Sequence, residues 1–421
     1  MTDKEGIVQV KPLISSIKLF LGKLFSRKPK TPPKKEPPKR SQEELLALLE
    51  KYKEAVRVNP QDGMGHYNLG EVYIELSRFS EALPSLKEAI RINPKLRSAY
   101  YQLGFALVQM GRDEDALEPL GQALQLDPKT QVTRKMLAEA HTNLSVMLGK
   151  SKQHKNAISH IQKAIEVLPG YGPAYLSLGI CFTEMGRYQE ALAKIQEALK
   201  LDKNLMVDAH FNFAIIHSKL GDTAKAVKHY QEAVKVNPKS ALPNLNLGML
   251  YAKLGKYKEA VQPLRTAIKV SPKMALEAHF KLGVVLVKLK RYKEAVKPLQ
   301  EAVKLTPHNQ KVKDFLAEAL YQTSLSYREP DDADREIELL KQAVEHNPEH
   351  VLSHYWLGQA FDKTHQGYYA IVHTMIAKQF FVEAHKDDWI GKSLRVLQLM
   401  LKKYKYTQKD FAKVRVPRKP A

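Results

Sequence analysis

Prolines recur in this chain at a fixed interval. Pro60, Pro94 and Pro128 lie 34 residues apart. Between them the same order of features returns, namely a Leu-Gly pair, two alanines seven positions apart and a closing proline, as in Leu69-Gly70, Ala82, Ala89 and Pro94. A fixed period of this length indicates stacked structural repeats, because one such unit is too small to bury its own apolar surface.

Each repeat is predicted to form two amphipathic helices. The glycine of the Leu-Gly pair lets a partner helix approach closely. A short turn such as Met110-Gly111-Arg112 or Leu254-Gly255-Lys256 leads into the second helix. The two alanines are about two helical turns apart, so they share one face and permit tight helix contact. The proline then ends the repeat, because it lacks an N–H group and clashes with the preceding turn.

These residues resemble the tetratricopeptide repeat family. Its pattern is best matched in the sixth unit, by Leu247-Gly248, Tyr251, Ala260, Leu264, Ala267 and Pro272. The resemblance implies an all-α fold, a right-handed superhelical solenoid of antiparallel helix pairs. It also implies that the first helices line a concave surface. Nine units are expected within residues 62–388, beginning near residues 62, 96, 130, 171, 205, 240, 274, 309 and 350.

The remaining segments are assigned by composition and pattern. Residues 1–40 combine a basic amphipathic helix with a linker rich in proline and lysine, and residues 41–61 match only the second helix of a repeat, opened by a Ser41–Glu44 capping box. Residues 389–408 are expected to form a C-terminal capping helix, and residues 409–421 a frayed basic tail.

Two units are longer than the others and are expected to have long first helices. The units at 130–170 and 309–349 each exceed the period by seven residues, which adds about two helical turns. The inserted sequences resemble each other, which indicates either duplication or a shared partner contact. The eighth unit also departs from the family pattern, with Ser324 in place of the glycine and Glu336 in place of the first alanine.

Residues 12–28 have the pattern of a helix that lies in a membrane surface. Large apolar residues at helical spacing would enter the lipid, and cations beside them would face anionic headgroups. The residues concerned are Leu13, Ile14, Ile17, Lys18, Phe20, Leu21, Lys23, Leu24, Phe25, Arg27 and Lys28. The alternative is a helix that packs on the end of the solenoid or in its groove.

The net charge of +22 lies mainly at the two ends of the chain. Residues 1–40 carry +8 and residues 402–421 carry +7, which leaves +7 for everything between them. A nucleic-acid partner is therefore not favoured, since the basic ends also lack interleaved aromatics for base stacking. A lone cysteine, no apolar run of membrane-spanning length and no secretory signal predict a cytoplasmic protein, peripheral to the inner face of a membrane if residues 12–28 bind lipid.

No catalytic or cofactor motif is found in the sequence. It contains no HExxH, no P-loop, no G-x-S-x-G and no paired cysteines, so a non-enzymatic chain without a cofactor is expected. A row of histidines occupies one position of alternate units, but helices pack 8 to 10 Å apart, so the rings lie too far from one another to share a metal. The row consists of His66, His141, His210, His279 and His354.

The concave surface is the expected binding site, for a peptide or an amphipathic helix. Family resemblance assigns to it Tyr67, Tyr101, Phe105, Ile180, Phe211, Ile215, Leu245, Met249, Phe280, Val284, Tyr321 and Tyr355, and a ladder of Asn68, Asn143, Asn212 and Asn246 that would hold peptide backbone. Packing between helices is the alternative for the apolar residues. The predicted function is a non-enzymatic scaffold or adaptor tethered to a membrane; the alternatives are a soluble nucleic-acid-associated protein and a regulatory subunit of an enzyme complex.

Overall fold

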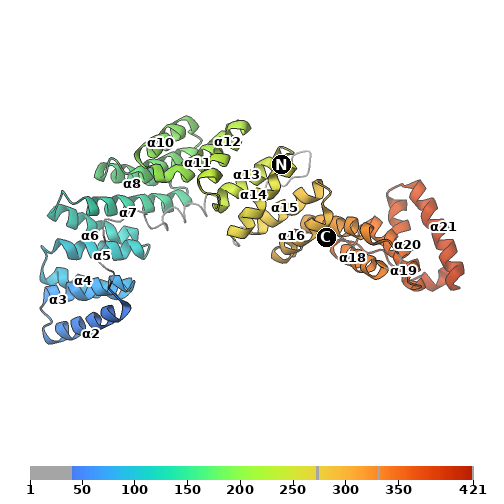
Figure 1. Cartoon of the computed structure of the whole chain (residues 1–421), viewed down its shortest axis with the longest axis horizontal. Helices are drawn as coiled ribbons and strands as arrows, with labels where there is room; N and C mark the ends of the chain where they lie inside the picture. The colour runs from blue at the N-terminus through green and yellow to red at the C-terminus, as the bar shows by residue number, and fades with distance from the viewer. Residues whose placement is uncertain (1–39, 272–274, 330–331, 420–421) are drawn as a thin grey trace. The chain divides into compact units, whose positions relative to one another are not determined.

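The computed structural model describes residues 40–271, 275–329 and 332–419, and over these residues all regular structure is helical. The chain divides into two compact units, residues 1–236 and 237–421. Each consists of antiparallel helix pairs stacked on one another (Figure 1). The expected all-α solenoid of helix pairs is therefore confirmed in both units.

The N-terminal unit begins with the half-repeat α2 (Gln42–Val58) and continues with five helix pairs. Ser41 and Glu44 form the predicted capping box at the start of α2, with N–O distances of 3.1 and 2.6 Å. The first helices of the pairs are α3 (Gly63–Glu75), α5 (Arg97–Gln109), α7 (Gln131–Lys150), α9 (Gly172–Glu184) and α11 (Met206–Lys219). The second helices are α4 (Phe79–Ile92), α6 (Asp113–Leu126), α8 (His154–Val167), α10 (Tyr188–Leu201) and α12 (Thr223–Val236).

The C-terminal unit contains four further pairs and one additional helix. Its first helices are α13 (Ala241–Lys253), α15 (Ala275–Lys288), α17 (Gln310–Ser324) and α19 (Val351–Lys363). Its second helices are α14 (Tyr257–Val270), α16 (Tyr292–Leu305), α18 (Ala333–His346) and α20 (Gly367–Glu383). The additional helix, α21 (Asp387–Tyr404), packs against α20 at the predicted capping position.

One contact closes most of the helix pairs. A leucine or isoleucine of the second helix lies directly over the glycine of the Leu-Gly pair, as Leu120 lies over Gly104. A Cβ atom at Gly104 would stand 2.4 Å from Cγ of Leu120, which leaves no room for any side chain. The same contact joins Leu86 to Gly70, Ile195 to Gly179, Leu264 to Gly248 and Leu299 to Gly283. The predicted alanines complete the seam, since Ala116 and Ala123 are fully buried.

The two long units share an early helix start and differ at the helix end. The first helix α7 has 20 residues, compared with 13 in α3 and α5, which confirms the predicted extension. In contrast, α17 has 15 residues and gives way at Leu325 to a short 3-10 helix, η3 (Leu325–Tyr327). In the eighth unit the predicted extension of about two turns is therefore only partly formed as α-helix. At this end the hydroxyls of Ser324 and Ser326 donate to the carbonyls of Tyr321 and Thr323, and such side-chain hydrogen bonds compete with those of the helix backbone.

The predicted membrane helix at residues 12–28 lies outside the described residues, as does the linker that follows it. Across the part of the chain that is described, no helix combines the length and the apolar character needed to cross a bilayer.

The Leu-Gly seam gives a direct test of the fold. Gly104→Ala should lower the free energy of unfolding by about 1–3 kcal/mol, because the added methyl group overlaps Leu120 and must push α5 and α6 apart. Gly121→Ala is the matched control in α6, where a Cβ atom would meet nothing within 4 Å. It should stabilise by up to about 1 kcal/mol through helix propensity. Urea unfolding followed by circular dichroism measures both; equal effects would contradict the role of the seam.

Candidate functional site

The first-helix face of the N-terminal unit carries partly exposed aromatic side chains. Tyr67 of α3 and Tyr101 and Phe105 of α5 are half-buried. The ring of Phe105 stacks on Tyr101 at 6.4 Å between centroids and meets Phe79 edge-on at 6.2 Å. These aromatic side chains are held in place by their neighbours while keeping accessible surface. Such a surface suits apolar side chains of a partner.

Carboxylates lie beside these aromatics. The hydroxyl of Tyr67 donates to Glu71 at 3.1 Å, and Asn143 of α7 donates to Asp113 at 2.8 Å.

Burial raises the pKa of Asp113. Burial also raises the pKa of Glu139 on α7, while the charge of Lys135 lowers it. Burial and the charge of Glu139 together raise the pKa of Tyr101, which places that carboxylate near the aromatic face. The face is therefore both aromatic and acidic.

In the C-terminal unit, three of the predicted groove residues keep accessible surface. Met249 of α13 and Phe280 and Val284 of α15 are half-buried. Phe280 meets Phe315 of α17 edge-on at 5.9 Å, so the apolar surface continues from α15 to α17. Burial raises the pKa of Glu277 and lowers the pKa of Lys281 on the same helix.

The other predicted groove residues lie in the interior. Phe211 is fully buried and packs on the ring of Tyr230 at 5.8 Å, within its own helix pair. In the structure these residues pack between helices, which is the alternative stated above, and they offer almost no surface to a ligand. They are Ile180, Phe211, Ile215, Leu245, Tyr321 and Tyr355, each at most 7% exposed.

The predicted asparagine ladder separates into two kinds of side chain. Asn212 and Asn246 are buried, and each amide donates to a carbonyl of its own helix, Asp208 and Leu242 respectively. Those two amides are thus directed away from a peptide backbone. Asn68 and Asn143 are half-buried on the first-helix face, and Asn143 is bonded to Asp113 as described above.

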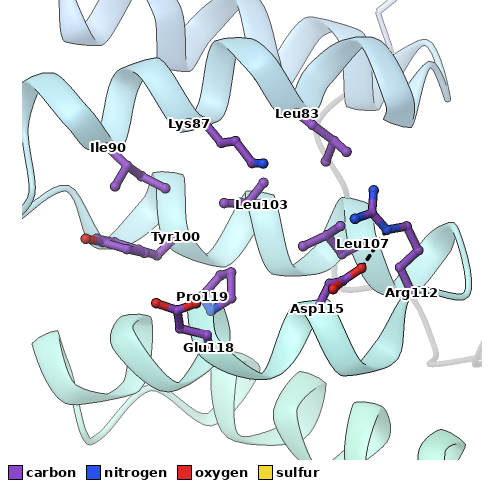
Figure 2. Close-up of a pocket in the computed structure, with 10 residues that line it drawn as sticks. All are labelled: Leu83, Lys87, Ile90, Tyr100, Leu103, Leu107, Arg112, Asp115, Glu118 and Pro119. Atoms are coloured by element: carbon purple, nitrogen blue, oxygen red, sulfur yellow. Dashed lines mark hydrogen bonds and ion pairs between the residues drawn. The ribbon is translucent and has the colours of Figure 1, made fainter.

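A pocket of about 410 Å³ lies on α4, α5 and α6 of the N-terminal unit (Figure 2). Leu103 and Leu107 of α5 line it together with Leu83 and Ile90 of α4. Charged groups from Lys87, Arg112, Asp115 and Glu118 also line the pocket, and Arg112 donates to Asp115 at 2.7 Å. Its mixed lining favours a long amphipathic side chain over a compact apolar ligand.

Three histidine pairs are a feature that the sequence pattern did not reveal. In each, a ring of the first helix meets a ring of the second helix 19 residues later, with Nδ1 atoms 2.9 to 3.0 Å apart. The pairs are His141–His160, His210–His229 and His354–His373. The repeated spacing of 19 residues between two histidines is the feature of the sequence from which these pairs could have been predicted. Among the described residues, no group of three or more metal-ligating side chains is present.

Each histidine pair favours neutral rings. One ring must donate its Nδ1–H and the other must accept, which a doubly protonated pair cannot do. Burial lowers the pKa of His354 to about 4, and burial with the neighbouring His354 lowers the pKa of His373 to about 3. Burial likewise lowers the pKa of His141 and of His229 to about 4.

Family models described as tetratricopeptide repeat or TPR repeat match most of the repeat region, over residues 70–111, 98–130, 136–204, 174–239, 211–275 and 245–309. This chain belongs to the tetratricopeptide repeat family. Its helix pairs therefore constitute a TPR protein-interaction scaffold.

Several curated proteins are similar to parts of this TPR protein. Photosystem I assembly protein Ycf3 of Cyanophora paradoxa is 37% identical over 76 residues, 17% of this chain and 44% of that protein. The Ycf3 of Synechococcus elongatus is 39% identical over 77 residues, with the same coverage. Mouse DnaJ homolog subfamily C member 7 is 28% identical over 90 residues, 21% of this chain and 18% of that protein. The chain thus spans less than half of the length of these relatives.

Solved structures resemble the TPR protein more distantly. Pseudomonas aeruginosa pilF is 23% identical, covers 53% of this chain and 97% of its own, and has a TM-score of 0.44. YrrB, described as a TPR protein with an unusual peptide-binding site, is 22% identical, covers 49% of this chain and 98% of its own, and has a TM-score of 0.35. At this level the likeness assigns no ligand to the chain.

The histidine pairs predict that this TPR protein loses stability in mild acid. A ring whose pKa falls from its ordinary value of 6.5 to about 4 on folding stabilises the fold fully above pH 6.5. As pH falls below 6.5 the unfolded chain takes up protons and the folded chain does not, so stability declines by about 2 kcal/mol for each such ring between pH 8 and pH 5.

Urea unfolding at pH 8, 6.5 and 5 measures this decline. His160→Ser is a suitable variant, since Ser85 stands at the equivalent position opposite His66 in the first repeat. It removes one titrating ring and should make the fall in stability shallower than in the unmodified chain. An equal slope in both proteins would contradict a contribution from this pair.

Proposed function

We propose that the chain is a non-enzymatic adaptor that binds a protein segment along its first-helix faces. The observation that carries this proposal is the half-buried row of Tyr67, Tyr101 and Phe105 in the N-terminal unit. Aromatic side chains that are fixed by neighbours and still accessible lose little freedom on binding, so they are efficient anchors. Met249, Phe280 and Val284 offer a comparable surface on the C-terminal unit.

The charges beside the anchors favour a basic partner segment for the N-terminal unit. Glu71, Asp113 and Glu139 stand on or next to this face, and burial raises the pKa of the last two. The attraction of a cation placed against them would offset the cost of that desolvation. The partner is therefore an extended or helical segment with apolar residues for the aromatic row and lysine or arginine between them.

The similarity to Ycf3 supports an adaptor role of this kind. Ycf3 is named as an assembly protein, and a repeat surface that holds a client segment during assembly has the chemistry described here. The similarity covers 17% of this chain, so the identity of the client is not transferred with it.

Site-specific photo-cross-linking tests the adaptor proposal in the organism that encodes the chain. A photoreactive phenylalanine analogue at Phe105 should form an adduct with a discrete partner, because this ring lies on the proposed face. The same analogue at Leu126 is the matched control, since Leu126 is 42% exposed at the end of the second helix α6. The adduct at Phe105 should disappear with Tyr101→Ala. Adducts of equal yield at Leu126, or none at Phe105, would refute the proposed face.

We also propose that residues 12–28 tether this adaptor to an anionic membrane surface. The support is the sequence pattern of seven large apolar residues with flanking cations. Burial of those apolar side chains would dominate the binding energy, and the cations would select the lipid. A tether of this kind would concentrate the adaptor where a membrane-bound client is assembled.

Liposome co-sedimentation tests the tether. The full chain should bind anionic vesicles and keep binding in high salt, because apolar insertion is not screened. Leu21→Glu with Leu24→Glu in the full chain should abolish this binding, and Leu46→Glu, at an exposed site of α2, should not. Failure of the full chain to bind would overturn the tether. Salt-sensitive binding to DNA or RNA instead would favour the nucleic-acid alternative.

A further inference from the structure

The C-terminal tail, residues 405–419, folds back on its own unit, although the composition predicts a frayed end. The helix α21 ends at Tyr404, and the next residue, Lys405, adopts a left-handed conformation with φ of 59°. Just before it, the hydroxyl of Tyr404 donates to Asp362 at 2.8 Å. Thr407 and Asp410 then cap the short 3-10 helix η5 (Gln408–Phe411). The chain is thereby reversed and directed back along the unit.

An aromatic anchor fixes the near end of the tail. Phe411 is 2% exposed and belongs to the core cluster formed by α17 to α21. Its ring stacks on Tyr368 at 5.3 Å and meets Tyr406 edge-on at 5.5 Å. Val414 packs on the same cluster.

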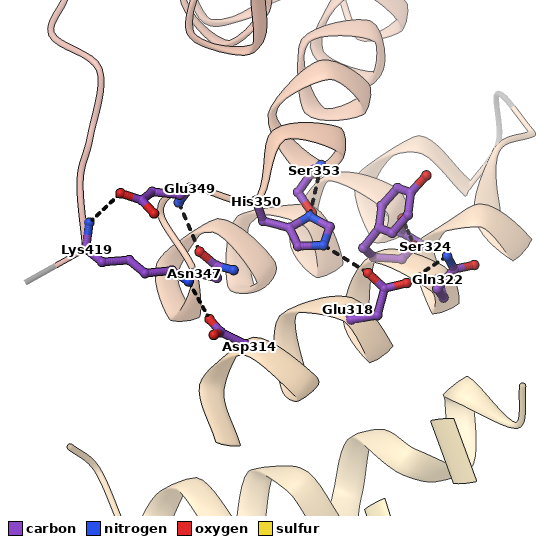
Figure 3. A network of polar contacts seen from close by, with 10 residues as sticks. Asp314, Glu318, Gln322, Ser324, Asn347, Glu349, His350, Ser353 and Lys419 are labelled. Carbon is purple, nitrogen blue, oxygen red and sulfur yellow. Dashed lines mark hydrogen bonds and ion pairs between the residues drawn. The ribbon is translucent and has the colours of Figure 1, made fainter. Parts of the chain in front are cut away.

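Two consecutive cations fix the far end. Arg418 donates to both carboxylate oxygens of Glu383, at 2.9 and 2.7 Å, and lies over the ring of Phe380 at 5.2 Å. Lys419 lies 3.0 Å from Asp314, and its backbone N–H donates to Glu349 at 3.3 Å (Figure 3). Three carboxylates from α17, α20 and the α18–α19 loop therefore converge on one Arg-Lys pair.

One of these carboxylates, Asp314, is present at this position because the first helix of the eighth unit is extended at its N-terminal end. Asp314 lies in the part of α17 that precedes the start of an ordinary first helix. The equivalent residue of the other long helix, α7, is Lys135, because Asp314 and Lys135 each lie ten residues before the serine at the glycine position, Ser324 and Ser145 respectively. The extension thus supplies an anion in the C-terminal unit and a cation in the N-terminal unit, and among the described residues a basic segment lies on the anion.

We propose that this surface is a binding site for an extended cationic segment of a partner protein and that the tail occupies it in cis. We define the tail site as Asp314, Glu349, Phe380 and Glu383. A partner segment with an aromatic or aliphatic anchor followed by an Arg-Lys pair displaces the tail. The ion pairs favour exchange, because the side chains of Arg418 and Glu383 are 53% and 37% exposed. Such pairs are individually weak and easily replaced.

The tail acts as a competitor at high local concentration. A tethered ligand of this length is present at its site at an effective concentration on the order of millimolar. A segment arriving from another molecule must overcome it, so weakening the tail contacts should strengthen binding in trans by at least about tenfold. This inference is independent of the first-helix faces proposed above as the adaptor surface.

Fluorescence anisotropy with a labelled peptide of residues 405–421 tests the tail site in the full chain. The chain with Arg418→Ala and Lys419→Ala should bind this peptide at least about tenfold more tightly than the unmodified chain. Arg395→Ala with Lys402→Ala removes the same charge from exposed positions of α21 and should leave binding as weak as in the unmodified chain. Adding Asp314→Asn and Glu383→Gln to the tail-weakened chain should abolish binding.

Either of two results would overturn the tail site. One is equal binding of the peptide to the unmodified and tail-weakened chains. The other is binding that survives Asp314→Asn with Glu383→Gln, which would indicate nonspecific attraction of a basic peptide. Circular dichroism of each variant checks that the helices are retained. The cross-linking at Phe105 uses the other unit, so the two proposals can fail separately.

Discussion

The close approach of two helices at a glycine is the contact on which this structure depends. Leu120 over Gly104, and the same pair in four other repeats, brings each second helix nearer than any side chain on the first would allow. The flanking alanines have no exposed surface, because the helices meet along their whole length. Where serine replaces glycine, as at Ser145 and Ser324, the buried hydroxyl donates to its own helix at 2.6 and 2.7 Å. The seam is thus kept without an unsatisfied polar group.

The eighth unit departs most from this regular packing. Glu336 stands where the first alanine belongs and is fully buried, with Lys363 at 2.9 Å and Arg328 at 3.8 Å. A buried ion pair of this kind stabilises little in net terms, because desolvation offsets the attraction. The first helix of the same unit, α17, ends early at Ser324. The same unit carries the extension whose Asp314 contacts the tail, so the buried Glu336 and the contact with the tail occur in one repeat.

The sequence predicted the helix pairs, their turns and their seam, because these depend on local spacing. The turn glycines Gly111 and Gly255 have φ of 73° and 71°, as a left-handed turn requires. Accessibility was not predictable in the same way. Tyr101 and Phe211 occupy equivalent positions, yet one is half-buried and the other buried, because exposure depends on how closely the next pair packs. The histidine pairs and the tail contacts join residues from different helices, which a periodic pattern along one helix does not specify.

The charge distribution connects the two proposed binding surfaces. A chain with a net charge of +22 would repel a basic partner at long range, and salt at physiological concentration screens that repulsion beyond about 8 Å. At short range the relevant groups are carboxylates: Glu71 and Glu139 beside the aromatic row, and Asp314, Glu349 and Glu383 around the tail. At both surfaces the local negative charge is therefore opposite in sign to the net charge of the chain. The two proposals therefore require basic segments that also supply an apolar anchor, since cations alone would gain too little from partly exposed ion pairs to overcome the repulsion.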